Sequence, residues 1–209
     1  MIISFVNQKG GVGKTTLSLC AAFELAIKNK VLVIDADPQG SIMDWSESRE
    51  DDLPKNVSIA SMANKTIHRD IKRLAKGYDY VIVDTPPRLS DITRSAIMVS
   101  TMVVIPCTPS PYDVWAAEET LELVREAKIY NKKLKTVFVI NKKILNTVIG
   151  RDVKNAIESL GNDFTVCPTE IHQRVIFAEA AAQGKLVQEI DKENKATAEI
   201  KKFVVQLIK

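Results

Sequence analysis

The chain has 209 residues, of which 45% are hydrophobic and 26% are charged, and its formal net charge is +3. These proportions are ordinary for a globular domain and exclude a disordered chain, a collagen-like fibre and a coiled coil. No apolar run approaches the roughly 18 to 20 residues that a membrane-spanning helix needs. Residues 1–127 hold 14 basic against 17 acidic residues, whereas residues 128–209 hold 15 against 9. This C-terminal excess of positive charge is typical of a protein that binds a polyanionic partner, and equally of a basic surface that is simply solvated.

The three cysteines, Cys20, Cys107 and Cys167, are far apart in the sequence and form no Cys-x-x-Cys pair. This spacing argues against a disulfide framework and a clustered metal site, and it indicates reduced thiols. The first motif begins by Lys9, which leaves no room ahead of it for a charged and then apolar leader. We therefore expect a cytoplasmic protein.

Short β-branched runs alternate with longer helical stretches along the chain, which predicts βαβ units around a parallel sheet. The expected strands are Ile2–Val6, Val31–Asp35, Tyr80–Asp84, Met102–Cys107 and Thr136–Asn141. The expected helices are about Thr15–Asn29, Asp113–Tyr130, Arg151–Leu160, Arg174–Gln183 and Asn194–Ile208. The polar stretch Arg49–Lys55 is interpreted as a surface loop. We predict one α/β domain over residues 1–209, a mostly parallel twisted sheet flanked by helices on both faces.

The strongest motif is Lys-Gly-Gly-Val-Gly-Lys-Thr-Thr at residues 9–16, between the first expected strand and helix. Glycines allow a tight turn that points successive N–H groups at phosphate oxygens, and the following helix adds its positive N-terminal dipole. Lys14 can then reach the β- and γ-phosphates, and the Thr15 hydroxyl can ligate Mg²⁺. The motif predicts a P-loop NTPase. The expected nucleotide-binding residues in it are Gly10, Gly11, Val12, Gly13, Lys14, Thr15 and Thr16.

The loop departs from an ordinary Walker A motif, because Gln8 stands where that motif has its first glycine and a second lysine, Lys9, follows. Asn-Gln-Lys-Gly-Gly-Val-Gly-Lys-Thr-Thr closely resembles the deviant Walker A signature of the ParA/MinD ATPases. The resemblance implies that ATP and Mg²⁺ are the cofactors. It also implies that two chains sandwich two ATP molecules, with Lys9 contacting the partner's nucleotide.

The resemblance extends over nearly the whole chain. Val31–Gly40 is similar to the family's switch I, which implies that Asp37 positions the attacking water and that Asp35 lies near the metal. A polar strand end followed by a Pro-Gln-Gly turn would explain both aspartates equally well. Tyr80–Pro87 resembles the family's Walker B and switch II, where Asp84 would hold Mg²⁺. The catalytic candidates are thus Lys9, Lys14 and Asp37, and the metal candidates are Thr15, Asp35 and Asp84.

Three later features also bear on the site. Pro106–Trp115 is similar to a loop and helix start of small ParA proteins, in which Asp113 is suited to be a helix N-cap. Asn141 stands where family members often recognise the adenine ring, although asparagine also suits any exit from a strand. Thr169–Lys185 resembles the late family motif near the adenine and the DNA-facing surface. Trp45 and Trp115 are interpreted as packing residues.

The resemblance implies a small ParA-type ATPase without the N-terminal helix-turn-helix of larger relatives. Such a protein would be stimulated by a ParB-like or other cargo-bound activator, bind nonspecific DNA as a homodimer and associate with the nucleoid. The DNA-binding candidates are Arg174, Lys185, Lys192, Lys195, Lys201 and Lys202.

Two alternatives stay open. One is a MinD-like membrane-associated ATPase, because Ile200, Phe203, Val204, Leu207 and Ile208 would share one face of a basic C-terminal helix. We favour the interpretation that this face packs inside the domain and that a membrane is not a partner. The other alternative is a nucleotide-gated scaffold that hardly hydrolyses ATP.

Overall fold

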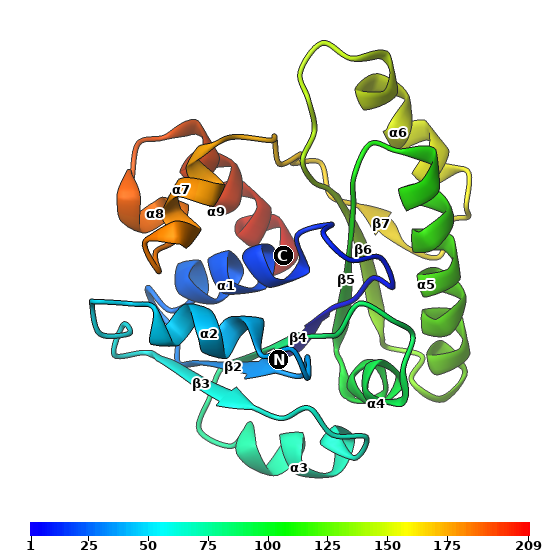
Figure 1. Ribbon diagram of the computed structural model, residues 1–209. Coiled ribbons are helices and arrows are strands. Elements are labelled where there is room, and N and C mark those ends of the chain that lie inside the picture. Colours follow the sequence, from blue (N-terminus) through cyan, green and yellow to red (C-terminus); the bar gives the residue numbers. More distant parts are fainter.

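The computed structural model describes residues 1–209 and contains one seven-stranded sheet, whose strands all run parallel in the order β3-β2-β4-β1-β5-β6-β7 (Figure 1). The strands are β1 Ile2–Phe5, β2 Val31–Asp35, β3 Val57–Ser61, β4 Tyr80–Asp84, β5 Met102–Cys107, β6 Lys135–Ile140 and β7 Thr165–Val166. The helices are α1 Lys14–Leu25, α2 Ser41–Glu47, α3 Ile67–Leu74, α4 Asp91–Val99, α5 Pro111–Tyr130, α6 Val148–Glu158, α7 Ile176–Ala182, α8 Val187–Ile190 and α9 Lys195–Leu207.

Helices cover both faces of the sheet, so successive residues of a strand enter different cores. Val31 and Val33 of β2 join the apolar cluster under α1 and α9, whereas Leu32 and Ile34 join the cluster under α3 and α4. A third cluster lies between β5, β6, α5 and α6. Because both faces are buried, the strands are continuous apolar runs rather than alternating ones. The predicted single α/β domain is therefore confirmed, and the sheet is wholly rather than mostly parallel.

All five expected strands are present to within one residue at each end. The prediction missed β3, β7 and the helices α2, α3, α4 and α8. The first helix was predicted too long, because α1 ends at Leu25 rather than at Asn29. The Asn29 side-chain amide donates to the Leu25 carbonyl at 2.9 Å and so closes the helix end.

The C-terminal helix α9 packs inside the domain, against α1 and α8 (Figure 1). Ile200, Phe203, Val204 and Leu207 are buried in the same cluster as the helix α1 side chains. This confirms the expectation that the apolar face belongs to the fold, with α1 rather than the sheet as its main neighbour. Ile208 is different, because it follows the end of the helix and is exposed. No helix of the structure has both the length and the apolar character needed to cross a membrane.

One single-residue expectation was wrong, and one side chain of a correctly predicted loop is buried. The stretch Arg49–Lys55 is a loop, as predicted, but the Arg49 side chain is only 3% exposed and belongs to the interior. Trp45 is buried as expected, whereas Trp115 is 59% exposed and stacks edge-on against Tyr112, which is also exposed.

Candidate nucleotide-binding site

The phosphate loop connects β1 to α1 at the carboxyl edge of the sheet. Its glycines are required by the backbone, since Gly11 and Gly13 have φ of +76° and +94°, in the left-handed region that side chains disfavour. A Cβ on Gly13 would overlap the side-chain nitrogen of Asn141. The loop can therefore have this shape only with glycine at residue 13.

Lys14 is the first residue of α1, and its side chain is buried beneath the loop. Its ammonium donates to the Lys9 carbonyl oxygen at 3.1 Å. Burial lowers the pKa of Lys14, and the negative charges of Asp84 and Asp37 oppose that effect. A partly desolvated ammonium next to a loop of N–H groups is well suited to bind phosphate.

Thr15 and Asp84 form the pair expected of a magnesium site. The Thr15 hydroxyl donates to Asp84 Oδ2 at 2.6 Å, while the buried Asp84 Oδ1 has no hydrogen-bond partner. Burial raises the pKa of Asp84 to about 7, and the hydrogen bond from Thr15 and the charge of Lys14 oppose that rise. A hydroxyl next to a carboxylate with a free, desolvated oxygen fits the oxygen ligands that Mg²⁺ prefers.

Asp35 lies next to Asp84 in the sheet, but its oxygens are engaged by the backbone. Oδ1 accepts the N–H of Asp37 at 3.1 Å, and Oδ2 accepts the N–H groups of Ile42 and Met43 at 3.0 and 3.3 Å. Asp35 therefore fixes the start of α2. Asp37 lies in the turn before α2, half-exposed, and accepts the N–H of Gln39 at 3.0 Å.

Lys9 is paired within its own chain. Its ammonium contacts the buried carboxylate of Asp113, which also accepts the hydroxyl of Thr108. The expectation that Asp113 is a helix N-cap was wrong, because α5 begins at Pro111 and Asp113 lies inside its first turn. The carboxylate is used instead to hold a lysine that precedes it by more than a hundred residues.

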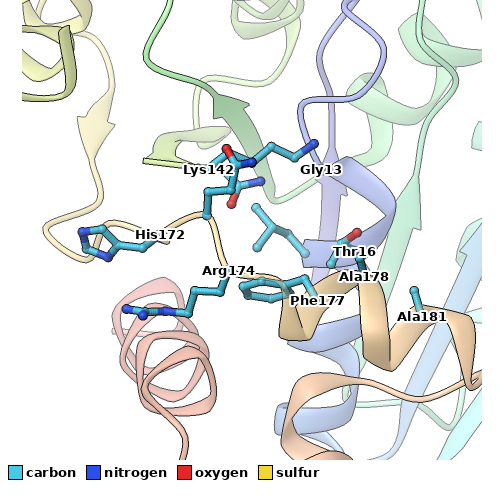
Figure 2. A pocket seen from close by; sticks show the side chains of 11 residues that line it. Gly13, Thr16, Lys142, His172, Arg174, Phe177, Ala178 and Ala181 are labelled. Atoms are coloured by element: carbon cyan, nitrogen blue, oxygen red, sulfur yellow. The ribbon is translucent and has the colours of Figure 1, made fainter. Parts of the chain in front are cut away.

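A cavity of about 310 Å³ opens beside the phosphate loop (Figure 2). Its lining residues come from the loop, from the exit of β6 and from the segment leading into α7: Gly13, Thr16, Leu17, Asn141, Lys142, His172, Gln173, Arg174, Phe177, Ala178 and Ala181. The structure thus brings Asn141 and the late motif together next to the phosphate loop. Lys142 and Phe177 were not singled out from the sequence, because neither belongs to a spacing that signals a ligand.

The CobQ/CobB/MinD/ParA nucleotide binding domain model (CbiA) matches residues 3–187. The chain belongs to this family. Among curated relatives of the family, the maintenance of carboxysome distribution protein A of Halothiobacillus neapolitanus is 29% identical over 198 residues, 94% of this chain and 91% of that protein. The sporulation initiation inhibitor protein Soj of Bacillus subtilis is 29% identical over 231 aligned residues, 88% of each protein.

Solved structures agree with the family in fold. Apo McdA from Cyanthece superposes with a TM-score of 0.82 at 19% identity, covering 100% of this chain and 99% of that one. MinD from Pyrococcus horikoshii in complex with Mg-ADP superposes with a TM-score of 0.79 at 19% identity, covering 100% and 96%. The family match and the shared fold together make the chain a nucleotide-binding domain of the CobQ/CobB/MinD/ParA family.

The basic residues predicted to contact DNA fall into two groups. Arg174 points away from the phosphate loop toward α9 (Figure 2), where it donates to Glu199 at 2.6 Å, and Lys185 pairs with Asp51 at 3.3 Å. The Lys201 ammonium lies 3.4 Å from the carbonyl of Lys192. The exposed members of the set without any ion pair are Lys192, Lys195 and Lys202.

Proposed function

We propose that this chain is a ParA-type ATPase that dimerises around Mg-ATP, binds nonspecific DNA in that state and releases it after hydrolysis. The observation that supports this most is the phosphate loop with a buried Lys14 under it and the Thr15–Asp84 pair beside it. By family likeness, the task would be the partition of DNA or the positioning of another cargo, under the control of a ParB-like or other activator protein.

Each residue of the site has a chemical task in this proposal. Thr15 and Asp84 would hold Mg²⁺, which neutralises charge on the phosphates when bound. Lys14 stabilises the negative charge that develops during phosphoryl transfer, and Asp37 orients the attacking water. Asp35 supports that geometry through the turn that carries Asp37, which we favour over direct metal contact since both of its oxygens are engaged.

Point variants test the hydrolysis step. Lys14→Ala should abolish both ATP binding and phosphate release, because the buried ammonium is lost from the phosphate loop. Asp37→Ala should keep ATP binding and lose turnover. Binding is measured by equilibrium titration with ATP and turnover by phosphate release with an activator present. Phosphate release by Asp37→Ala at the wild-type rate would refute the water-positioning role.

Dimerisation is supported by what surrounds Lys9. A second depression, next to the phosphate loop, is lined by Lys9, Gly10 and Gly11 together with Ile144 and Ile149. Both isoleucines are exposed, as are Leu145 and Val148 next to them in the sequence and Tyr112 and Trp115 in the first turns of α5. Neighbouring exposed apolar residues are typical of sites of protein–protein contact. Lys9→Ala should weaken ATP-dependent dimerisation in sedimentation experiments more than it weakens nucleotide affinity.

DNA binding is proposed to use the unpaired lysines Lys192, Lys195 and Lys202, whose ammonium groups are free to contact phosphates. Purified protein should retain a random-sequence duplex with ATP, not with ADP or without nucleotide, and should release it at higher salt. Replacing the three lysines by glutamine should reduce the slope of log affinity against log salt by roughly 0.9 for each phosphate that is no longer neutralised.

The matched control replaces three other exposed and unpaired lysines, Lys132, Lys133 and Lys135 at the start of β6, by glutamine. This control changes the net charge by the same amount, so only a local DNA contact separates the two variants. Equal loss of DNA binding in both would mean that net charge alone is responsible. Binding to anionic liposomes is not expected, because the apolar face of α9 is buried. A DNA-bound dimer would be found with the nucleoid.

A further inference from the structure

Two neighbouring residues after β6 hold the outer side of the phosphate loop. The Asn141 side-chain amide donates to the Val12 carbonyl at 2.8 Å, and the Lys142 ammonium donates to the Gly11 carbonyl at 2.6 Å. Figure 2 shows Lys142 extending from the β6 exit toward the loop. Both donors therefore bind consecutive peptide groups of the loop that is expected to receive phosphate.

The geometry of the peptide bond gives these contacts a consequence for binding. In a planar trans peptide, the carbonyl and the N–H of the next residue point in opposite directions. Holding the Gly11 carbonyl outward therefore turns the Val12 N–H inward, and holding the Val12 carbonyl outward does the same for the Gly13 N–H. A cation on a carbonyl oxygen also polarises its peptide group and so strengthens the opposite N–H as a donor.

The backbone at Lys142 is strained in a way that serves this contact. Lys142 has a φ of +54°, one of two positive values among the non-glycine residues. The next residue is fixed on both sides, since the Lys143 N–H donates to the Ile171 carbonyl and the Lys143 carbonyl accepts the Gln173 N–H, each at 3.0 Å. Strained residues of this kind persist only where the surrounding structure holds them, and they gather at functional sites.

We propose that Lys142 is a positioning residue which, with Asn141, orients the N–H groups of the phosphate loop before nucleotide binds. It acts through the Gly11 peptide and not by touching phosphate or base itself. This inference rests on the proposed nucleotide-binding function. It predicts that Lys142 contributes to the binding of any polyphosphate, whether or not a base is attached.

The test compares Mg-ATP with Mg-tripolyphosphate, a ligand that has the phosphates and lacks the base and ribose. The variants are Lys142→Met, which keeps the length of the side chain and removes its donor, and Lys142→Arg, which restores a cationic donor. The control is Lys143→Met, because the neighbouring ammonium binds Glu170 at 2.6 Å, away from the loop. Affinities are measured by competition against a fluorescent ATP analogue, and the unfolding midpoint of each nucleotide-free protein is recorded.

Loss of a charge-assisted hydrogen bond at this loop should weaken both ligands by the same factor, about tenfold. Lys142→Arg should stay close to wild type, Lys143→Met should bind both ligands normally, and the unfolding midpoints should agree. A loss confined to Mg-ATP would overturn the inference by placing Lys142 on the base, and unchanged affinities would overturn it outright. Wild-type protein that binds neither ligand would instead refute the proposed function, and the inference with it.

Discussion

Arg49 joins the segment after α2 to Gly184, which lies between α7 and α8, and to Glu189 in α8, and its replacement should destabilise the protein. Its guanidinium donates to both carboxylate oxygens of Glu189, at 2.8 and 3.1 Å, and to the Gly184 carbonyl at 2.8 Å. The same group lies over the rings of Trp45 and Phe23, 4.9 and 5.5 Å from their centroids. The perturbation is Arg49→Met, which keeps an apolar chain of similar length and removes every polar contact.

The magnitude follows from these contacts. Hydrogen bonds to a charged partner are worth about 1.5 to 3 kcal/mol, and a cation over an aromatic ring adds about 0.5 to 1 kcal/mol. Glu189 is partly exposed and regains water once Arg49 is removed, which limits the loss. We expect a decrease of roughly 2 to 4 kcal/mol in the free energy of unfolding. For a chain of this size, that is a fall of about 10 °C in the unfolding midpoint.

Urea and thermal unfolding of the two proteins measure this difference. The control is Arg73→Met, because Arg73 is 78% exposed and contacts only Asp70, at 3.5 Å, and should change stability by less than about 0.5 kcal/mol. Gly184→Ala tests the same contact between the two segments by changing Gly184 instead of Arg49. Its Cβ would lie 2.8 to 2.9 Å from the backbone of residues 48 and 49. If Arg49→Met were as stable as the Arg73 control, the buried contacts would not have the energetic weight assigned to them.

Two further predictions concern titratable groups. Burial tends to raise the pKa of Glu199, but hydrogen bonds from Arg174 and His172 outweigh it, and the net result is a pKa below the usual 4.5. A lowered carboxyl pKa contributes stability at neutral pH that is lost as the pH falls through the folded-state pKa. The difference in the free energy of unfolding between wild type and Glu199→Gln should therefore become smaller as the pH falls from about 7 to about 3. Urea unfolding across that pH range measures this difference, and a difference that stays constant would contradict the prediction. Burial raises the pKa of the Cys20 and Cys107 thiols to about 12 and also raises that of Cys167, so a thiol reagent should titrate none in the native protein and all three in urea.

The sequence predicted those features whose cause is local. Buried parallel strands such as Val31–Asp35 and Met102–Cys107 are continuous apolar runs, and their limits were predicted correctly. The phosphate loop was predictable because glycine spacing and Lys14 encode the turn and the charge together. Both signals lie within a few residues of the structure they specify.

The features that the sequence did not predict lack a clear local signal. The helix α2 has only seven residues, and its first N–H groups are bound by Asp35 at the end of a strand and not by a residue at the helix start. The edge strand β3, Val-Ser-Ile-Ala-Ser, is half-buried and short of β-branched residues on one face. Asp113 was predicted to be a helix N-cap because aspartate is favourable at that position, whereas its actual partner is Lys9. Long-range pairs of this kind leave no mark in the local pattern.

Three lysines converge on the phosphate loop, and their contacts help to fix its shape. Lys14 binds the carbonyl of residue 9, Lys142 binds the carbonyl of residue 11, and the Lys9 ammonium is neutralised by Asp113. Two of the three ammonium groups thus donate to carbonyl oxygens and form no direct ion pair, although the charges of Asp84 and Asp37 also act on Lys14. An incoming polyphosphate can therefore approach Lys14 and Lys142 without breaking a direct ion pair at either residue. The Lys9–Asp113 pair is different, since in the proposed dimer Lys9 would reach a second nucleotide only by leaving a buried carboxylate behind. Phosphate binding and dimer formation should therefore have separate energetic costs in this chain.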